Sequence, residues 1–489
     1  MKTISFIAVV LFAVSAISIQ TAAAQSQDQR NADIEQLKNK LQQLDQMMTE
    51  VKGEIRALEG TSAPPAAPLV GQGQAEGQQA PAPQEPMIAV PSEAIIAQPQ
   101  AGTVPLEGEI TERQNSVSFY GFTMLDSGYD FGQINPNWYD VVRPTQLPSF
   151  KNEFAPSGNV YASVRQTRFG VKSSTPTPYG DLNTIFEFEL FGTGVDAGQT
   201  TFRLRHAYGE LGQFGAGQTW SPFMDIGVFP NTVEYWGPSG MVFFRNVQIR
   251  WMPIRKKTGS VTIALERPGA SGDQGTYSDR IELSNIRPRF NFPDLSGNAR
   301  IDRSWGYLQV AGIVRKIGWV DVSGNPVNLG ASVVGWGVNT TSNLNLSKNN
   351  VAKLAFVYGA GIENYMDDAP VDVGIQNQPN SPIPIKGVAL PVLGVVAFLD
   401  HSWNKHFTSS VGYSLVDIQN SNAQLPSDFH QGHYAVGNLL YHPIPRVTMG
   451  GEFQFGRRVN FSDGFSANDY RMQFSFKFDW DKSFKSPTL

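Results

Sequence analysis

The sequence carries two pairs of oppositely charged residues at the spacing of β-strands. Glu187 and Glu189 alternate with phenylalanines, and Arg203 and Arg205 alternate with apolar side chains. Because residues i and i+2 of a strand share one face, each pair lies on the polar face of its strand. A turn centred near Asp196 would place Glu187 opposite Arg205 and Glu189 opposite Arg203. Such a face is suited to recognising charged groups through guanidinium and carboxylate hydrogen bonds.

The same alternation brings further arginines to polar faces, namely Arg168, Arg250 and Arg315. It predicts apolar, outward positions for His206, Tyr208 and Phe243. Two interpretations of the arginines stay open. They are the hydrated arginines of an ordinary polar lumen, or they form a basic ladder that replaces part of the hydration shell of an anion. The neighbouring glutamates would neutralise part of that ladder.

The composition argues against several other chemistries. The 489-residue chain has no cysteine, which excludes disulfides, thiolate metal sites and a cysteine nucleophile. Its net charge of −5 gives no electrostatic reason to expect nucleic-acid binding. His430 and His433 stand three residues apart, so on a strand they point to opposite faces and cannot share a metal. No nucleophile motif or phosphate-binding loop is found either, and we expect no enzyme, no metal and no cofactor.

The N-terminal part of the chain is expected to be separate from the strands. Residues 1–24 have a lysine, an apolar core and a small-residue cleavage site, which is typical of a secretory signal peptide. Residues 25–60 contain an apolar heptad repeat that predicts an α-helical coiled coil for oligomerisation. The heptad positions are Ile34, Leu37, Leu41, Leu44, Met48, Val51, Ile55 and Leu58. The core residues alone do not settle the number of helices. Residues 61–114, with nine prolines, are expected to form an extended linker.

Residues 115–480 alternate between apolar and polar side chains with a period of two. The segment from Tyr470 to Trp480 keeps this pattern over a length that matches a lipid-facing strand. Sixteen such segments predict an all-β fold, a 16-stranded antiparallel transmembrane β-barrel, with eighteen strands as the alternative count. The eighth segment, at 279–287, has the weakest pattern. Residues 481–489 would form a C-terminal tail.

Four motifs resemble those of the DcaP-like trimeric outer-membrane porins of Gram-negative bacteria. They are Ser118–Phe122, Gln166–Lys172, Thr177–Leu182 and Gly217–Asp225. The resemblance implies a homotrimer of barrels in the outer-membrane bilayer, with the N-terminal coiled coils in the periplasm. It also implies small organic anions such as dicarboxylates as solutes. Barrels of this family usually end on an aromatic residue, whereas nine residues follow Trp480 here.

The segment 221–240 has two interpretations. By itself it is an ordinary surface loop with three prolines. By the resemblance it is a loop that folds into the pore after the fifth strand and narrows it. The residues that would then stand across from the arginines are Asp225, Glu234, Tyr235 and Trp236.

Two functions follow from the sequence. The first is an outer-membrane porin that favours small organic anions over other hydrophilic solutes. The alternative is a non-selective general-diffusion porin that also tethers envelope layers through its coiled-coil extension.

Overall fold

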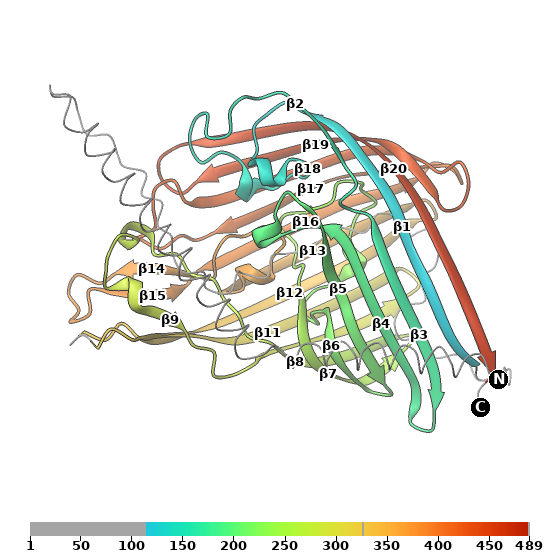
Figure 1. Ribbon diagram of the computed structural model, residues 1–489, viewed down its shortest axis with the longest axis horizontal. Coiled ribbons are helices and arrows are strands. Elements are labelled where there is room, and N and C mark those ends of the chain that lie inside the picture. The colour runs from blue at the N-terminus through green and yellow to red at the C-terminus, as the bar shows by residue number, and fades with distance from the viewer. Residues whose placement is uncertain (1–113, 325–326, 488–489) are drawn as a thin grey trace, which may run out of the picture. The chain divides into compact units, whose positions relative to one another are not determined.

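The computed structural model describes residues 114–324 and 327–487, which form an all-β barrel (Figure 1). The expected signal peptide, the heptad segment and all of the linker up to residue 113 lie outside the described residues. Among the residues that the structure describes, no helix is long and apolar enough to cross a membrane.

Eighteen strands join in one antiparallel sheet. The first nine are β1 (Gln114–Asp130), β2 (Asn159–Ser163), β3 (Arg168–Thr177), β4 (Gly180–Phe191), β5 (Thr200–Leu211), β6 (Phe214–Trp220), β7 (Arg245–Lys256), β8 (Gly259–Glu266) and β9 (Ile286–Pro288). The other nine are β10 (Asp294–Arg303), β11 (Gly306–Asp321), β12 (Ala331–Ser347), β13 (Asn350–Ala360), β16 (Pro391–Ser402), β17 (Phe407–Ile418), β18 (Phe429–Tyr441), β19 (Val447–Asn460) and β20 (Ser466–Pro487).

These eighteen segments make sixteen barrel strands because two of the strands are interrupted. Both β2 and β3 pair with β1, and both β9 and β10 pair with β11. Strand β1 pairs with β20 along the whole length of β1, from Gln114 opposite Pro487 to Asp130 opposite Arg471, and this closes the ring. The predicted count of sixteen is confirmed, and the described barrel strands close on one another without an open edge.

The remaining elements lie in the connections. A two-stranded sheet consists of β14 (Val373–Asn377) and β15 (Ile385–Ala389). The short 3-10 helices are η1 (Pro136–Trp138), η2 (Pro144–Gln146), η3 (Gly194–Asp196), η4 (Ile226–Val228), η5 (Gly275–Tyr277), η6 (Leu283–Asn285) and η7 (Glu363–Tyr365).

Strand β20 shows why the period-two pattern predicts this fold. Met472 and Phe474 point outward and are 48% and 45% exposed, whereas Arg471 and Gln473 point inward and are buried. Apolar side chains thus face the lipid, and polar side chains face the interior. The strand continues beyond Trp480 to Pro487, so most of the segment expected as a tail pairs with the start of β1.

The predicted position of the eighth strand is wrong. Residues 275–285 form η5 and η6 in a loop, and the strand is β10, at 294–303. The outward face of β10 presents Leu295 and Ile301 but also the small residues Gly297 and Ala299. Two small residues between the apolar ones weaken the alternation of hydrophobicity, which is why the sequence pattern points elsewhere.

The two ends of the barrel differ in the length of their connections. Turns such as 178–179 and 304–305 are short and lie at the end where β1 begins and β20 finishes. The connections at the other end are long, especially 221–244, 267–285 and 361–390. In outer-membrane barrels the short turns face the periplasm and the long loops face the outside. The long-loop end is therefore the extracellular end.

The interior of the barrel contains a hydrophobic core made largely by loops. The buried cluster includes Trp138, Phe223, Trp236 and Tyr365 from connections, packed against inward residues such as Val396 of the wall. Apolar contact thus holds the inserted loops inside a barrel whose wall is otherwise polar on that side.

Candidate functional site

The loop 221–244 follows β6, the fifth barrel strand, and crosses the interior to the far wall. The backbone amides of Val233 and Glu234 donate to the carboxylate of Glu452 in β19, each at 2.9 Å. The amide of Asn231 donates to Asp400 Oδ1 in β16 at 3.1 Å. Bonds from one loop to distant strands fix its path through the barrel.

Glycines allow the loop to lie close to the wall. A side chain at Gly240 would collide with the carbonyl group of Leu415, and one at Gly394 would collide with the carbonyl oxygen of Gly240. The amide of Gly240 also donates to Ser414 Oγ at 2.8 Å. The absence of side chains at both glycines thus permits backbone-to-backbone packing here.

Glu234 is fully buried between its own loop, the connection after β1 and strand β18. Its carboxylate accepts hydrogen bonds from the amides of Val142, Trp236 and Gly237 at 3.0, 2.9 and 2.6 Å, and from the Tyr434 hydroxyl at 2.9 Å. Burial raises the pKa of Glu234, and these bonds act against that rise. Both oxygens of this carboxylate are therefore used to hold the loop in place.

The other residues proposed for this loop also make internal contacts. Asp225 accepts from Thr341 Oγ1 at 2.6 Å and from the amide of Gly227 at 2.9 Å. The Tyr235 ring stacks on Phe191 with centroids 3.8 Å apart. The Trp236 indole donates to the carbonyl oxygen of Asp367 at 3.0 Å. All three proposed residues are buried, so they fix the position of the loop.

The two glutamates and several arginines form one buried cluster on the wall of β3, β4 and β5. Arg205 donates from Nε to Glu187 Oε1 at 2.6 Å and from Nη1 to Glu189 Oε2 at 2.8 Å. Arg168 lies 3.8 Å from Glu187 and 3.3 Å from Glu189. The Tyr120 hydroxyl adds a hydrogen bond of 2.6 Å to Glu187. The glutamates and arginines that alternation places on one wall thus lie in contact in the structure.

A β-bulge in β5 changes the face of the residues that follow it. Glu189 lies opposite Arg203 as expected, but Glu187 lies opposite His206, because the register shifts between Glu187 and Phe188. The predicted outward positions of His206 and Tyr208 are therefore wrong. His206 is buried and contacts Thr219 Oγ1 at 3.0 Å, and Tyr208 bonds Glu210. One extra residue in a strand inverts the alternation beyond it.

Arg245 joins the cluster although alternation gives no sign of it. It begins β7, lies 3.7 Å from Glu189 and has its guanidinium 4.8 Å from the centroid of the Trp220 ring. Phe243, predicted to point outward, precedes the strand and is buried in the loop core. The strand starts later than its sequence pattern suggests. Alternation counted from Phe243 therefore does not predict that Arg245 points into the cluster.

Arg250 is inward and part-buried, apart from the glutamates. It donates to Gln248 Oε1 and to the carbonyl oxygen of Trp220, and its guanidinium lies 5.1 Å from the centroid of the Tyr208 ring.

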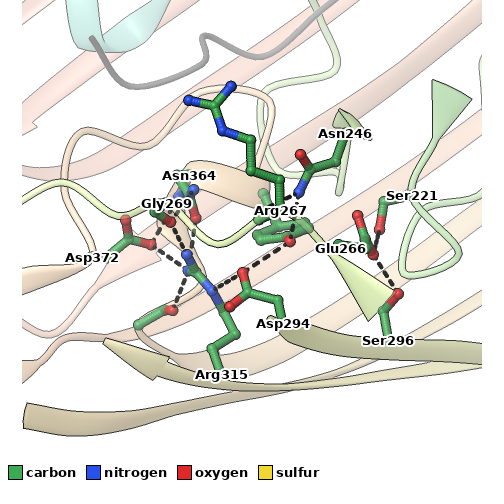
Figure 2. A network of polar contacts seen from close by, with 12 residues as sticks. Ser221, Asn246, Glu266, Arg267, Gly269, Asp294, Ser296, Arg315, Asn364 and Asp372 are labelled. Carbon is green, nitrogen blue, oxygen red and sulfur yellow. Dashed lines mark hydrogen bonds and ion pairs between the residues drawn. The ribbon is translucent and has the colours of Figure 1, made fainter. Parts of the chain in front are cut away.

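Arg315 holds two loops together (Figure 2). Its guanidinium lies 2.8 Å from Asp294 and 3.0 Å from Asp372, and it also donates to Asn364 and to the carbonyl oxygens of Gly361 and Gly269. Two carboxylates offset its single charge. The expected role of Arg315 in contacting solute does not fit this arrangement, whereas a structural role does.

A cavity of about 410 Å³ lies among the extracellular loops. Charged side chains of both signs line it, namely Arg143, Asp273, Asp428 and Arg458. Burial and the neighbouring Asp273 raise the pKa of Asp428 to about 7. The Arg143 guanidinium lies 4.1 Å from the centroids of both Trp138 and Trp236. Sequence alternation did not indicate these residues, because three of the four charged residues belong to loops.

A closed sixteen-stranded antiparallel barrel with an apolar outer wall and a loop folded into its charged interior is an outer-membrane porin, a channel rather than an enzyme. The chain belongs to the DcaP outer membrane protein family, whose model matches residues 95–473.

A solved structure shows the same fold. The outer membrane channel DcaP of Acinetobacter baumannii is 18% identical, with a TM-score of 0.62, over 77% of this chain and 100% of that one. An anion-selective porin from Comamonas acidovorans is 10% identical, with a TM-score of 0.49, over 75% of this chain and all of that one. No curated protein matches the sequence.

Proposed function

We propose that this porin favours small organic anions, such as dicarboxylates, among the hydrophilic solutes that it passes. The observation that carries the proposal is the balance of charge in the cluster. Four arginines, Arg168, Arg203, Arg205 and Arg245, act electrostatically on Glu189, with Glu187 as the second carboxylate of the cluster. Within this cluster the arginines thus outnumber the glutamates by two, although the whole chain carries −5.

The arginines would act in two different ways. Arg205 is fully buried, so it attracts an anion through its field rather than by contact. Arg203 is half-buried and is the member of the cluster best placed to meet a solute. The glutamates hold the guanidiniums in place, which keeps the field fixed in space.

Binding in such a site must be weak enough for the solute to leave. A conducting site is expected to bind a dicarboxylate with a dissociation constant between high micromolar and millimolar, roughly −4 to −6 kcal/mol. Succinate or phthalate should therefore cause brief blockages of the ion current.

Reversal potentials across a salt gradient in planar bilayers test the proposal. We expect the wild-type channel to prefer anions, and Arg203→Gln, a half-buried position, to shift the reversal potential toward cations. The double variant Arg203→Ala/Arg205→Ala should shift it further and remove the blockages. The matched control Arg303→Ala/Arg457→Ala removes two exposed arginines and should change neither measurement. A cation-selective wild-type channel without dicarboxylate blockage would refute the proposal.

A non-selective pore is the second candidate, and the pairing of Arg315 favours it. Interior arginines held by carboxylates as fully as Arg315 would leave little field for an anion. In that case the heptad segment at 25–60 would add the role of tethering envelope layers. Deleting residues 25–112 separates the two roles, because a pore should still conduct whereas a tether loses its function.

We also propose a homotrimer with the N-terminal extension in the periplasm. The heptad repeat needs partner helices, and β1, the first described strand, begins at the short-turn end of the barrel.

A further inference from the structure

Three cations stand on the outer wall of the barrel at its extracellular end. Lys316 lies in β11 between Arg315 and Ile317, which are both buried inside, so Lys316 points outward, and it is exposed. Arg287 of β9 lies opposite Val320, an outward position of the same strand. We call Arg287, Arg289 and Lys316 the rim patch.

Arg289 completes the patch through the backbone. Its amide donates to the carbonyl oxygen of Gly318 at 2.8 Å, which continues the ladder between β9 and β11 by one residue. Gly318 lies between Lys316 and Val320 on the outward side. The three cations are therefore held on one ladder of the sheet, on the face that carries the lipid-facing residues.

None of the three cations forms an ion pair with another described residue. Arg287 donates to the carbonyl oxygens of Ser284 and Ile286, and Arg289 donates to Asn291 Oδ1. Lys316 Nζ lies 5.1 Å from the centroid of the Phe292 ring. Asp321 lies on the same ladder opposite Ile286, on the side of β11 that carries Arg315 and Ile317, and it accepts bonds from the amides of Ser323 and Leu329. The outward face of this ladder thus carries three cations that form no ion pair with a described acid.

The wall next to the patch is apolar. Val314 is 55% exposed, and Val334, which pairs with Lys316, is 64% exposed. Trp336 pairs with Val314 and is also exposed. Acyl chains would lie on this wall, and the cations stand at its extracellular border, the level of lipid headgroups.

We propose that the rim patch binds the phosphorylated headgroup of an outer-leaflet glycolipid, with the acyl chains of that lipid against β11 and β12. Phosphate oxygens match guanidinium donors and accept charge-assisted hydrogen bonds from Lys and Arg. Charge complementarity selects this occupant, since the patch faces the bilayer and not the pore. The proposal stands independently of anion selectivity.

Native mass spectrometry of the full chain in detergent, titrated with diphosphorylated lipid A, tests the site. Each cation near a lipid surface contributes about 1 kcal/mol, or roughly fivefold in affinity. We therefore expect Arg287→Gln/Arg289→Gln/Lys316→Gln to weaken binding by about 100-fold. Removing one phosphate from the lipid should also weaken binding. The control Lys257→Gln/Lys348→Gln/Lys405→Gln removes three exposed lysines from the short turns and should bind as the wild type does.

Two further measurements keep the test decisive. Arg287→Lys/Arg289→Lys keeps the charge and should retain binding. It therefore tests the role of charge even if the triple variant folds poorly. The triple variant should leave the reversal potential of the channel unchanged, because the patch faces lipid. Wild-type affinity in the triple variant, an equal loss in the control, or equal binding of a dephosphorylated lipid would overturn the proposal. A changed reversal potential would instead assign the patch to solute attraction.

Discussion

The interior arginines differ in how many carboxylates surround each of them. Arg315 has two aspartates and three further acceptors, whereas the cluster around Arg205 shares two glutamates among four arginines. The same residue type therefore serves two purposes in one lumen. Where carboxylates neutralise the arginine, as at Arg315, the ion pairs hold loops together. Where arginines are in excess, a field for anions remains.

Arg315→Gln should loosen the extracellular loops. The change leaves Asp294 and Asp372 buried without their cation, and breaking a buried ion pair in this way costs about 3–5 kcal/mol. We expect a lower free energy of unfolding in urea and faster proteolysis within 267–285 and 361–390. Arg280→Gln is the control, because its pair with Glu282 is exposed and contributes little. Equal stability of both variants would contradict the structural role.

Glu234→Gln should release the loop 221–244 from its fixed path. An amide offers one acceptor oxygen where the carboxylate offers two, and its NH₂ group would face either the Trp236 amide at the Oε1 position or the Gly237 amide at the Oε2 position. Unpaired buried donors cost about 1–3 kcal/mol each. Single-channel records should then show larger or fluctuating conductance. Steady wild-type conductance in this variant would mean that the loop is held mainly by its apolar core.

Sequence alternation predicts elements well where strands are regular and apolar on one face. It therefore gives β20, β4 and the number of barrel strands. It fails at β10, where Gly297 and Ala299 interrupt the apolar face, and beyond the bulge in β5, where the alternation inverts at Arg205. A bulge depends on the register with neighbouring strands, and no local residue pattern encodes that register.

The loop contacts were beyond prediction for a different reason. Alternation identifies which side chains point inward, but not which partners fill the interior. Glu234 and Arg315 are both inside the barrel, yet each bonds to segments far away in the chain. The sequence thus predicts the polar wall of the candidate site, whereas only the packed loops show which charges are neutralised.

The loops 267–285 and 419–428 are expected to respond to pH. Asp428 has its pKa raised to about 7 from an ordinary 3.8, by burial and then by Asp273 on the other loop. Because the folded pKa is raised, the stabilising contribution of protonated Asp428 is complete below about pH 4 and is lost as the pH rises toward 7. Above that, the two neighbouring side chains repel each other once Asp428 is ionised.

Conductance should therefore rise between pH 5 and pH 8 as the two loops separate, with the change centred near pH 7. Asp428→Asn keeps the shape of the side chain and removes its charge, so its conductance should stay at the low-pH value throughout. Asp463→Asn, in the neighbouring extracellular turn, serves as the matched control and should titrate as the wild type does. The same pH profile in Asp428→Asn would show that other groups set the response.

At the scale of the whole molecule, two surfaces are available for self-association. One is the heptad strip that the sequence predicts at 25–60, outside the described residues, and the other is the outer wall of the barrel, which carries a continuous aromatic group on β3, β4, β5 and β20. In that group Phe169 lies 5.8 Å from Phe188 and 5.7 Å from Trp480, and Phe188 lies 5.7 Å from Phe202, between ring centroids. Aromatic pairs of this kind are typical of both lipid contacts and protein interfaces.

Deleting residues 25–60 should weaken the proposed trimer without abolishing it. The heptad strip would stabilise the trimer only by packing against partner helices. Contacts between barrel walls would remain after its loss. Native mass spectrometry across a dilution series should show trimers for the full chain at all concentrations, and a shift toward monomers for the truncated chain only at low concentration. Replacing Leu41 and Leu44 with Asp breaks the strip while keeping the chain length, and it should reproduce the deletion. A full chain that is monomeric at every concentration would refute the trimer, whereas trimers of equal stability with and without residues 25–60 would assign assembly to the barrel walls alone.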